Sequence, residues 1–390
     1  MKPAFACILC ENVANGNQCR IRERHINPDR SLLDNITGPD DERIIFLTDG
    51  SQIRARNIRR EITIEPTPYT PKKQQGGQHM KSWLSSPLIW AGSKYRTLSR
   101  LLKKERLPRS GGCLVEPFVG SGTVFLNTDY QRYVLCDTNE ALINFFTTLT
   151  VCTEELISEA APLFSDTNRE AYYHHRTEFN ETASKRDRSY EDCLRLAALF
   201  LYLNHHCFNG IWRVSKKSGF NVPFRNKTRP FPEEELRQFA EKARRTRAEF
   251  LCVDFRHTLR AQHLLMSTDT VIYCDPPYLP ESKTADFRGY TAAGFTPDDH
   301  RDLVSHLLDV NRLYGAKVVI SNSDTKETRE IYAPFKLHRL KVQRSVSANG
   351  QRRGTADEVI GVLDGREMYV SAPRQEGKAT VMAQWRAASC

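Results

Sequence analysis

The stretch VIYCDPPYLP, residues 271–280, places a carboxylate and a phenol on either side of two prolines. An apolar run leads into Asp275, and Pro276 and Pro277 cannot continue a sheet because they have no N–H to donate. A strand is therefore predicted to end here in a stiff loop. The carboxylate and a proline carbonyl can both accept hydrogens from one amino group, while the ring of Tyr278 can stack on the attached heterocycle.

This pair of acceptors suits one particular reaction. The amino group of a nucleobase is a poor nucleophile, because its lone pair is delocalised into the ring. Two acceptors that pull on its hydrogens localise that pair and stabilise the positive charge that develops as the nitrogen attacks an electrophilic methyl carbon. A proline-rich turn without chemistry is the alternative, and the suitability of all four residues for one task favours catalysis.

A glycine loop, EPFVGSGTVF at residues 116–125, follows another apolar run. Gly120 and Gly122 let the backbone turn sharply and approach a ligand closely. A dinucleotide fingerprint would need a third glycine where Phe125 stands, and the stretch has no Gly-Lys-Ser/Thr phosphate cradle. The loop is therefore expected to face an uncharged or zwitterionic part of a cofactor. An ordinary tight strand-to-helix turn is the alternative.

Asp137 ends the next apolar run, RYVLCD, 17 residues after Gly120. An acid at the tip of the second strand can accept hydrogen bonds from ribose hydroxyls, as in dinucleotide-binding folds. The same region must also cap the helix predicted to follow, and Asp137 or Thr138 is expected as that cap. Beside the glycine loop, the ribose interpretation gains support.

Basic and aromatic residues interleave in FNGIWRVSKKSGFNVPFRNKTRPF, residues 208–231. Its middle predicts a hairpin with Gly219 in the turn, and such a β-ribbon fits the DNA major groove, where an arginine can contact guanine through two hydrogen bonds. A solvated basic loop is the alternative. The net charge of +10 is concentrated here, because residues 205–260 hold 13 Lys and Arg against 6 Asp and Glu. A polyanionic partner is consistent with this excess.

The chain of 390 residues is long enough for two or three domains. Residues 1–65 are predicted to form a small accessory module of unknown role that contains a hairpin, and residues 66–86 a linker rich in Pro, Gly, Gln and Lys. An alternative translation start at Met80 is left open. Residues 371–390 are expected to be a polar tail.

Cys7, Cys10, Cys19 and His25 offer four zinc ligands near the N-terminus. The first two have a good half-site spacing, but the spacings that follow match no common zinc finger. An extension without metal is the alternative, and no metal site is assigned.

The bulk composition bears on location and redox state. No run approaches the roughly 18 apolar residues of a membrane span, and the N-terminal residues lack a signal-peptide pattern. The 11 cysteines lie scattered in apolar segments, which fits reduced, buried thiols better than a disulfide framework. A cytoplasmic protein of bacterial or phage origin, with no membrane partner, is expected.

From about Leu88 onward, short apolar runs alternate with helical patterns. Residues 190–206 predict a strongly apolar helix, while TVIYCDPPY and AKVVISNSD predict short buried strands. This alternation predicts a mostly parallel sheet wrapped by helices, the α/β class.

At these residues the chain resembles the Dam-type DNA adenine methyltransferases. The match runs from about Leu88 to Asp364 and includes, in order, WAGSKY, CLVEPFVGSGTVFLNTD, CDTNEALI, FLYLNHHCFNGIWR, GFNVPF, FPEEELRQFAEKA, VIYCDPPY, SNSDT and RSVSANG. The resemblance implies a Rossmann-like methyltransferase sheet in residues 87–150 and 250–370, with a helical and β-hairpin DNA-recognition insert in residues 151–249. It implies methyl transfer from S-adenosyl-L-methionine to the 6-amino group of adenine in double-stranded DNA, usually in GATC. A monomer is expected.

The resemblance also implies roles for individual residues. Those implied at the cofactor are Trp90, Lys94, Phe118, Gly120, Gly122, Asp137, Asp254, Phe255 and Asp275. Those implied to grip an adenine flipped out of the duplex are Asp275, Pro276, Pro277 and Tyr278. Those implied at the DNA are Phe208, Asn209, Ile211, Arg213 and Pro223, with Arg213 on a guanine.

The chain departs from the family pattern at three positions. Ser93 replaces a usual glycine and is expected to alter only a local turn. Phe208 stands where tyrosine is frequent, and Trp212 is bulky where a small residue is common; both bear on sequence recognition. Two alternatives stay open: amino-group methylation of cytosine, RNA adenine or glutamine, and a catalytically silent DNA-binding regulator. The intact Lys94, Asp137 and Asp275 argue against the silent regulator.

Overall fold

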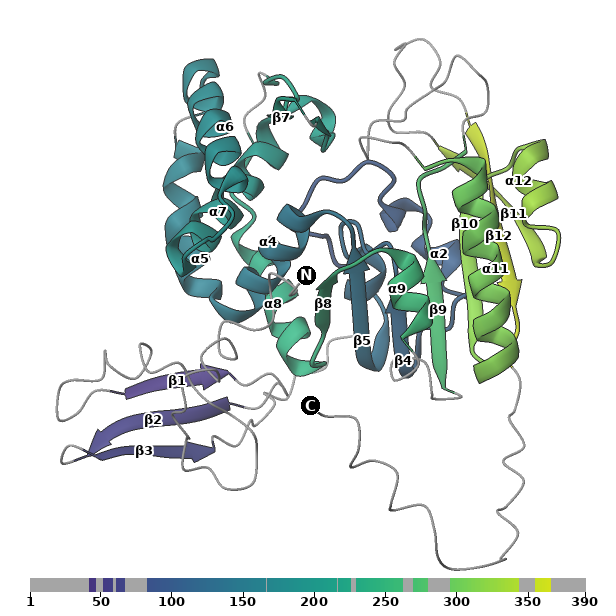
Figure 1. The fold of residues 1–390 in the computed structure, drawn as a ribbon, viewed down its shortest axis with the longest axis horizontal. Coiled ribbons are helices and arrows are strands. Elements are labelled where there is room, and N and C mark those ends of the chain that lie inside the picture. The colour runs from purple at the N-terminus through teal and green to yellow at the C-terminus, as the bar shows by residue number, and fades with distance from the viewer. Residues whose placement is uncertain are drawn as a thin grey trace, which may run out of the picture.

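The computed structural model describes residues 42–46, 52–58, 61–66, 83–165, 167–215, 217–225, 229–261, 269–279, 295–343 and 355–365. Its centre is a seven-stranded sheet in the order β11-β12-β10-β9-β4-β5-β8 (Figure 1). The strands from β8 to β10 run parallel, and β12 is antiparallel to both β10 and β11. The predicted mostly parallel α/β sheet is confirmed. Its strands are β4 (Ser110–Glu116), β5 (Asp129–Asp137), β8 (Glu249–Cys252), β9 (Thr270–Cys274), β10 (Lys317–Ser323), β11 (Lys336–Gln343) and β12 (Thr355–Leu363).

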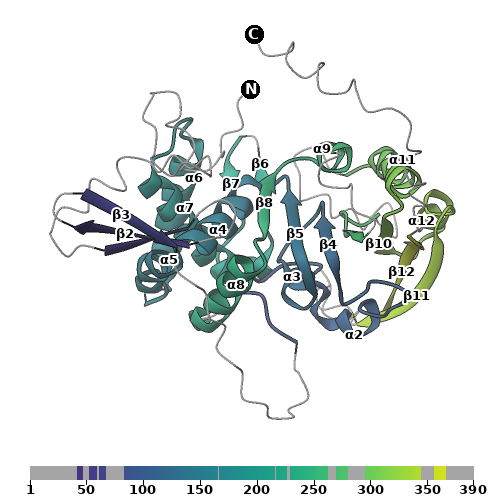
Figure 2. The same ribbon diagram turned by 90° about the horizontal axis from the view of Figure 1, so that it is seen from below.

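Helices cover both faces of this sheet (Figure 2). Alternate strand residues point to opposite faces, so Val115 packs with one set of helices and Leu114 with the other. The first set is α9 (Phe255–Arg260), α11 (Pro297–Tyr314) and α12 (Lys326–Ile331). The second set is α2 (Leu98–Leu101), α3 (Thr123–Leu126) and α8 (Glu233–Arg245). This two-sided burial explains why the central strands read as continuous apolar runs.

The boundaries of strand β9 and helix α11 follow from their local sequence. All five residues of β9 are buried, and the strand ends at the residue before Asp275, as predicted from the two prolines. Helix α11 begins with a capping box between Thr296 and Asp299 and ends at Tyr314, where the following Gly315 caps it with a φ of +67°.

A helical bundle continues from β5 and flanks the β8 edge of the sheet (Figure 1). Its helices are α4 (Glu140–Val151), α5 (Thr153–Ala160), α6 (Arg169–Ser184) and α7 (Tyr190–His206), and α7 packs against the other three. Short 3-10 turns lie at η2 (Lys94–Arg96), η3 (Ala161–Ser165) and η4 (Phe208–Gly210). After α7 the chain forms the predicted hairpin, β6 (Val214–Ser215) with β7 (Gly219–Phe220). Gly219 has a φ of +62°, which explains why glycine occupies this turn.

The N-terminal segment contributes a separate antiparallel sheet of β1 (Glu42–Phe46), β2 (Gln52–Ile58) and β3 (Glu61–Pro66). The predicted pairing of β1 with β2 is confirmed, although the turn between them lies outside the described residues. The four possible zinc ligands, Cys7, Cys10, Cys19 and His25, and the tail 371–390 also lie outside them. None of the described helices is long and apolar enough to cross a bilayer.

All seven cysteines within the described residues are free thiols, and five of them are buried. Burial raises the pKa of the Cys136 thiol to about 12. Such a thiol is protonated and unreactive at neutral pH. The prediction of free thiols is therefore confirmed for this part of the chain, and the prediction of burial for five of the seven, since Cys152 is half-buried and Cys252 is exposed.

Lys242 of α8 supports the end of α3 from inside the core. Its ammonium donates to the carbonyl of Leu126 at 3.0 Å and to the carbonyl of Thr128, and it lies 5.3 Å from the ring centre of Phe125. Carbonyls at a helix end carry partial negative charge, which favours a donor there. Burial nevertheless lowers the pKa of Lys242 to about 8.

This buried lysine predicts a stability that rises with pH. Below about pH 8 the amine is charged in both states, and burial penalises the folded state. Between about pH 8 and 10.5 the unfolded chain binds the proton more tightly, so the free energy of unfolding increases with pH. The free energy of unfolding of wild type, relative to that of Lys242→Met, should therefore rise by about 2 kcal/mol between pH 7 and 9.5, as measured by urea denaturation.

The exposed Lys326 on α12 provides the control for this experiment. The difference between wild type and Lys326→Met should stay constant over the same pH range. A wild-type advantage over Lys242→Met that does not grow with pH would contradict the buried charge.

Candidate active site

The carboxyl ends of the parallel strands meet at one edge of the sheet, where ligands bind in open α/β folds. A cavity of about 1460 Å³ lies there, between the sheet and the helical bundle. The lining includes most of the residues predicted for a cofactor or a target base, and one residue predicted to contact DNA, Ile211. These are Trp90, Lys94, Phe118, Gly120, Asp137, Ile211, Asp254, Phe255, Asp275, Pro276, Pro277 and Tyr278.

Asp275 lines this cavity and has a partner on each carboxylate oxygen. Lys94 approaches Oδ2 at 2.7 Å, and the hydroxyl of Ser321 donates to Oδ1 at 2.7 Å. Each carboxylate oxygen has two lone pairs, so both can still accept a hydrogen from a ligand. The acid is therefore fixed in orientation while it keeps acceptor capacity towards the cavity.

Lys94 is itself buried and held from several sides. Its ammonium donates to the carbonyl of Gly92 at 3.1 Å and lies 4.8 Å from the ring centre of Tyr278. Burial alone would lower the pKa of Lys94, but the charge of Asp275 and further acidic neighbours outweigh burial and raise it. Lys94 is consequently a permanent cation at neutral pH and the counterion of Asp275.

Gly120 and Asp137 join the glycine loop to the second strand. Gly120 has a φ of +50°, and a Cβ at this position would lie 3.1 Å from Nε1 of Trp90. Its N–H donates to Oδ2 of Asp137 at 3.2 Å. Burial raises the pKa of Asp137, and hydrogen bonds from the backbone oppose that rise. Glycine is required here both by the backbone and by the close approach of Trp90.

The expected cap of α4 was wrong. Neither Asp137 nor Thr138 caps the helix; the side chain of Asn139 accepts from the N–H of Leu142 at 3.3 Å. Asp137 instead accepts the N–H of Asn139 at 3.0 Å, one turn earlier. With the capping role taken by Asn139, the carboxylate of Asp137 lines the cavity.

Gly122 and Ser93 each contact neighbouring parts of the protein around α3. Gly122 opens α3 with a φ of +68°, and a Cβ there would meet Phe239 of the core at 2.8 Å, so this glycine is not among the cavity lining. The hydroxyl of Ser93 lies 3.0 Å from that of Thr123, which in turn lies 2.7 Å from that of Ser121. The serine that departs from the family pattern thus ties its turn to α3.

An aromatic corner forms another part of the wall. The rings of Phe118 and Phe255 are 5.8 Å apart, and Phe295 lies 5.7 Å from Phe118. Asp254 caps α9 by accepting the N–H of Arg256 at 2.9 Å, and the same arginine pairs with its carboxylate. This corner can therefore hold the flat ring of a ligand, with the carboxylate of Asp254 at the edge of that ring.

Sequence reasoning assigned no role to two residues at this site. Ser321, the hydrogen-bond donor to Asp275, belongs to the SNSDT motif, which was matched as a whole without roles for its members. Glu116 belongs to EPFVGSG, is buried, and has an Oε1 with no hydrogen-bond partner among the described residues. Burial and then the charge of Asp275 raise the pKa of Glu116 well above its usual value.

The residues predicted to contact DNA lie beyond the cavity, apart from Ile211. Phe208 is 50% exposed, Asn209 adopts a φ of +58°, and Arg213 and Pro223 are exposed. The Nε of Arg213 donates to Oδ1 of Asn221 at 2.8 Å, which fixes the plane of its guanidinium.

Trp212 does not reach this surface. Its side chain is buried and stacks on Phe220 of the hairpin with ring centres 4.2 Å apart. Trp212 therefore supports the hairpin from inside, and its bearing on sequence recognition stays a prediction.

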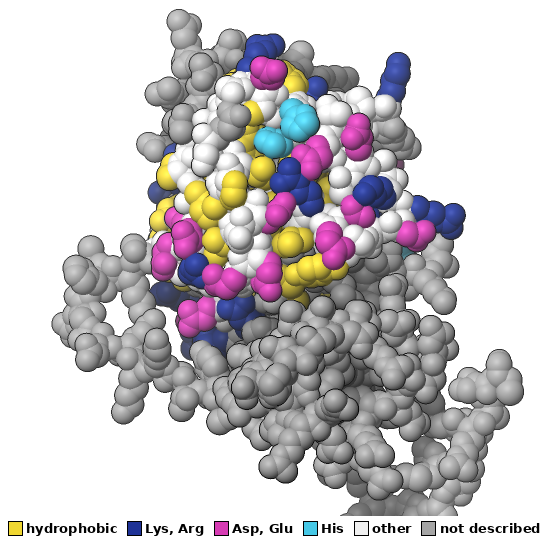
Figure 3. Space-filling view, turned by 90° about the vertical axis from the view of Figure 1, so that its left-hand side faces the viewer, with side chains coloured by type: hydrophobic (Ala, Val, Ile, Leu, Met, Phe, Trp, Pro, Cys, Tyr) yellow, Lys and Arg dark blue, Asp and Glu magenta, His cyan; other side chains and the backbone are white. Residues whose placement is uncertain are grey.

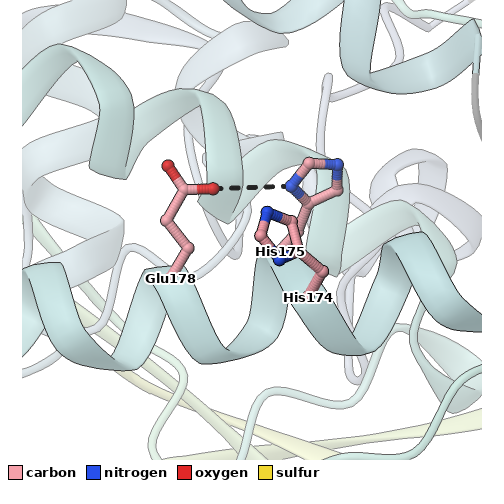
Figure 4. A group of neighbouring side chains, drawn as sticks. All are labelled: His174, His175 and Glu178. Carbon is pink, nitrogen blue, oxygen red and sulfur yellow. Dashed lines mark ion pairs between the residues drawn. The ribbon is translucent and has the colours of Figure 1, made fainter.

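A possible metal trio lies elsewhere, on α6. The potential ligand atoms of His174, His175 and Glu178 lie within 4.8 Å of one another (Figure 4). The carboxylate of Glu178, however, accepts two hydrogen bonds from Arg195, at 2.6 and 2.9 Å. A metal ion would have to displace that guanidinium, so the trio is an ion-pair cluster. Acidic, basic and histidine side chains are interspersed over the face that Figure 3 shows.

Comparison with known proteins agrees with this geometry. Residues 90–346 match the family model of the D12 class N6 adenine-specific DNA methyltransferases. DNA adenine methylase of Escherichia coli (strain K12) is 43% identical over 282 residues, which cover 70% of this chain and 94% of that protein. Its namesake from Vibrio cholerae is 42% identical over 71% of this chain and 95% of its own. That from Haemophilus influenzae is 40% identical over 76% and 99%. The chain belongs to the D12 class of N6 adenine-specific DNA methyltransferases.

Proposed function

We propose that this protein transfers a methyl group from S-adenosyl-L-methionine to the 6-amino group of adenine in duplex DNA. The observation that carries the proposal is the pairing of Lys94 with Asp275 at 2.7 Å, in the same cavity as the glycine loop and Asp137. An oriented acceptor for an amino group and a loop suited to a cofactor thereby face one space. Family membership supports the same reaction.

The residues present fit S-adenosylmethionine, which supplies an electrophilic methyl group on a positively charged sulfur. Gly120 lines the cavity, and because it has no Cβ its backbone can lie directly against Trp90. Asp137 suits the ribose hydroxyls, and the unpartnered Oε1 of Glu116 suits the ammonium of the methionine part. The aromatic corner of Phe118, Phe255 and Phe295 suits the adenine ring.

The chain's own residues then act on the target amino group. Asp275 and the carbonyl of Pro276 would each accept one hydrogen of that group and localise the lone pair of its nitrogen. As the nitrogen–carbon bond forms and the carbon–sulfur bond breaks, the carboxylate stabilises the positive charge on nitrogen. The surplus proton leaves along the hydrogen bond to Asp275 and passes to water. Tyr278 would stack on the flipped base.

Sequence choice would come from the hairpin and the turn before it. Phe208 would occupy space near the flipped base, with Asn209 beside it, while Ile211, Arg213 and Pro223 read neighbouring base pairs. The two NH2 groups of Arg213 make no hydrogen bond among the described residues, which suits a bidentate contact to guanine. GATC is the proposed site, and a monomer acting on double-stranded DNA is the proposed form.

The proposed division into domains fits this assignment, with one qualification. Residues 87–150 and 250–370 would carry the chemistry and residues 151–249 the recognition of DNA. Helix α8 of the insert nevertheless packs on the catalytic sheet, since Phe239 stacks on Phe146 at 4.6 Å and contacts Phe250. The accessory module 1–65 stays without an assigned role.

A silent DNA-binding regulator with this fold is the rival from another class. It would have no need for a buried cation held 2.7 Å from an acid inside a cavity, because that arrangement must overcome the desolvation of two charges. Transfer of radiolabelled methyl groups to unmethylated duplex DNA separates the two. The same assay with RNA, with DNA duplexes that contain only G·C pairs, and with glutamine peptides tests the other amino-group substrates.

The cofactor assignment predicts the effect of Gly120→Ala. The added Cβ crowds Trp90 and strains a left-handed backbone, so the Kd for S-adenosylmethionine should rise at least about 10-fold. Gly92→Ala is the matched control: its φ is +82°, but a Cβ there meets nothing within 4 Å. Calorimetric titration should show the smaller change for Gly92→Ala, and equal changes would contradict the assignment.

The chemistry predicts that Asp275→Ala lowers kcat at least about 100-fold, because the transition state loses its charged acceptor. Asp275→Asn keeps the shape and one acceptor oxygen and should lie between this variant and wild type. DNA affinity, measured by fluorescence anisotropy, should stay within a few-fold of wild type. Near-normal turnover by Asp275→Ala, with the variant folded by circular dichroism, would refute the site.

The recognition assignment predicts that Arg213→Ala relaxes choice at one guanine, with about 1–3 kcal/mol less discrimination between GATC and its single-base variants. The exposed Lys217 of the same hairpin is the control, and Lys217→Ala should slow methylation of all duplexes alike. Competition between barcoded duplexes, read by detection of methylated adenine, gives both results. An unchanged preference in Arg213→Ala would exclude this role.

A further inference from the structure

The two prolines of the Asp-Pro-Pro-Tyr loop limit how its backbone can be hydrogen-bonded to the rest of the protein. Pro276 and Pro277 have no N–H, so the backbone of the loop can offer few donors to the surrounding structure. A loop of this kind must be held mainly through its carbonyls, by donors from other elements. Those donors come from α11 and β10.

The first anchor is His300, one turn into α11. Its Nε2 lies 3.1 Å from the carbonyl oxygen of Pro277, and its Nδ1 lies 3.1 Å from the hydroxyl of Tyr332. A neutral imidazole has one donor and one acceptor nitrogen. Because a carbonyl can only accept, Nε2 is the donor, and Nδ1 then accepts from the tyrosine.

The second anchor is Asn322 in β10. Its Oδ1 accepts the N–H of Leu279 at 3.0 Å, and its Nδ2 donates to the hydroxyl of Tyr332 at 3.1 Å. The neighbouring Ser323 donates to the carbonyl of Leu279 at 2.6 Å. The far end of the loop is thus held through both of the backbone groups of Leu279.

These bonds form one relay with a single direction. Leu279 N–H donates to Asn322, whose amide donates to Tyr332; the tyrosine donates to His300, and the histidine donates to Pro277. The three side chains of the relay are fully buried, at 0% exposure each. Burial lowers the pKa of His300 to about 4, so the neutral form that this direction requires is the one present at neutral pH. The relay begins and ends on the same loop.

We propose that His300 is a positioning residue for methyl transfer, which fixes the loop through Pro277 as part of a relay with Tyr332 and Asn322. The inference rests on the proposed function, since it concerns the aim of the acceptors that grip the target amino group. Pro277 follows directly on the carbonyl of Pro276, so the bond to His300 fixes the peptide unit next to that acceptor. His300 and Tyr332 are absent from the cavity lining, so neither touches a ligand there directly. His300 also packs edge-on against Phe295 of the aromatic corner, with ring centres 4.7 Å apart, so the KM for the cofactor separates an effect through Phe295 from one through the loop.

The position of His300 allows a matched set of variants. His300→Gln keeps a nitrogen donor near Nε2, whereas His300→Asn is too short to reach Pro277. We expect His300→Asn to lower kcat about 10- to 100-fold, the loss that an ångström of misplacement brings, with the KM for DNA and cofactor changed less than about threefold. His300→Gln should recover most of kcat. Single-turnover methylation of a GATC duplex at saturating cofactor gives both values.

A double-mutant cycle tests whether the relay acts as a unit. Tyr332→Phe removes the hydroxyl from a buried ring without a large change in volume. If Tyr332 acts through His300, the double variant with His300→Asn should have the kcat of the worse single variant, rather than the product of both losses. Tyr332→Phe also keeps the proposal testable should His300→Asn fail to fold.

Asn311→Leu is the control for general destabilisation of α11. Asn311 is a buried polar residue on the same helix, and it donates to the carbonyl of Ala316 at 2.9 Å, at the end away from the loop. This variant should lower the thermal midpoint while kcat stays within about twofold of wild type.

Three results would overturn the proposal while wild type remains active: a normal kcat in His300→Asn, equal losses in the Gln and Asn variants, or additive losses in the cycle. Absence of methyl transfer by wild type in the same assay would instead reject the proposed function.

Discussion

The buried ion pair of Lys94 and Asp275 is the interaction on which the rest of the site depends. A carboxylate at the edge of an apolar core is stable only when its charge is matched and its lone pairs are hydrogen-bonded. Lys94 matches the charge from η2, and Ser321 supplies a hydrogen bond from β10, each at 2.7 Å. Three segments far apart in the chain must therefore be in place before the acid is held, so the site exists only in the folded protein.

The segment that carries Trp90 and Lys94 is anchored to the helical bundle as well as to α3. Asn204 near the end of α7 makes two hydrogen bonds of 2.8 Å to the backbone of Ile89, and His205 lies 2.8 Å from the carbonyl of Pro87. A Cβ on Gly210 would come within 2.4 Å of Ile89, so the turn after α7 lies directly on the same segment. The part proposed to read DNA and the part proposed to hold the cofactor are consequently packed as one piece.

The sequence predicted those features of the fold that interactions between neighbouring residues determine. The apolar run before Asp275, the two prolines after it and the glycines at positive φ each act within a few residues, and the structure confirms the strand and the turns they predict. The cap of α4 was mistaken because three adjacent residues could all cap, and only the backbone path selects Asn139. His300 and Tyr332 gave no local signal. Their partners lie 23 and 32 residues away in sequence, and only the packing of α11 and α12 beside β9 and β10 brings them together.

The charges at the site are separated in a way that favours one mode of entry. Glu116, Asp137 and Asp275 line the cavity together with Lys94, the counterion of Asp275, whereas the exposed Arg213 of the hairpin region lies outside the lining. Phosphate groups are attracted to exposed basic side chains such as Arg213 more than to buried carboxylates, which favours entry of a base without its backbone. A cationic cofactor suits the cavity, because its charge favours the ionised form of Glu116, whose pKa burial otherwise raises. The same acids thus suit the positively charged methyl donor and the uncharged, flipped base of the proposed reaction.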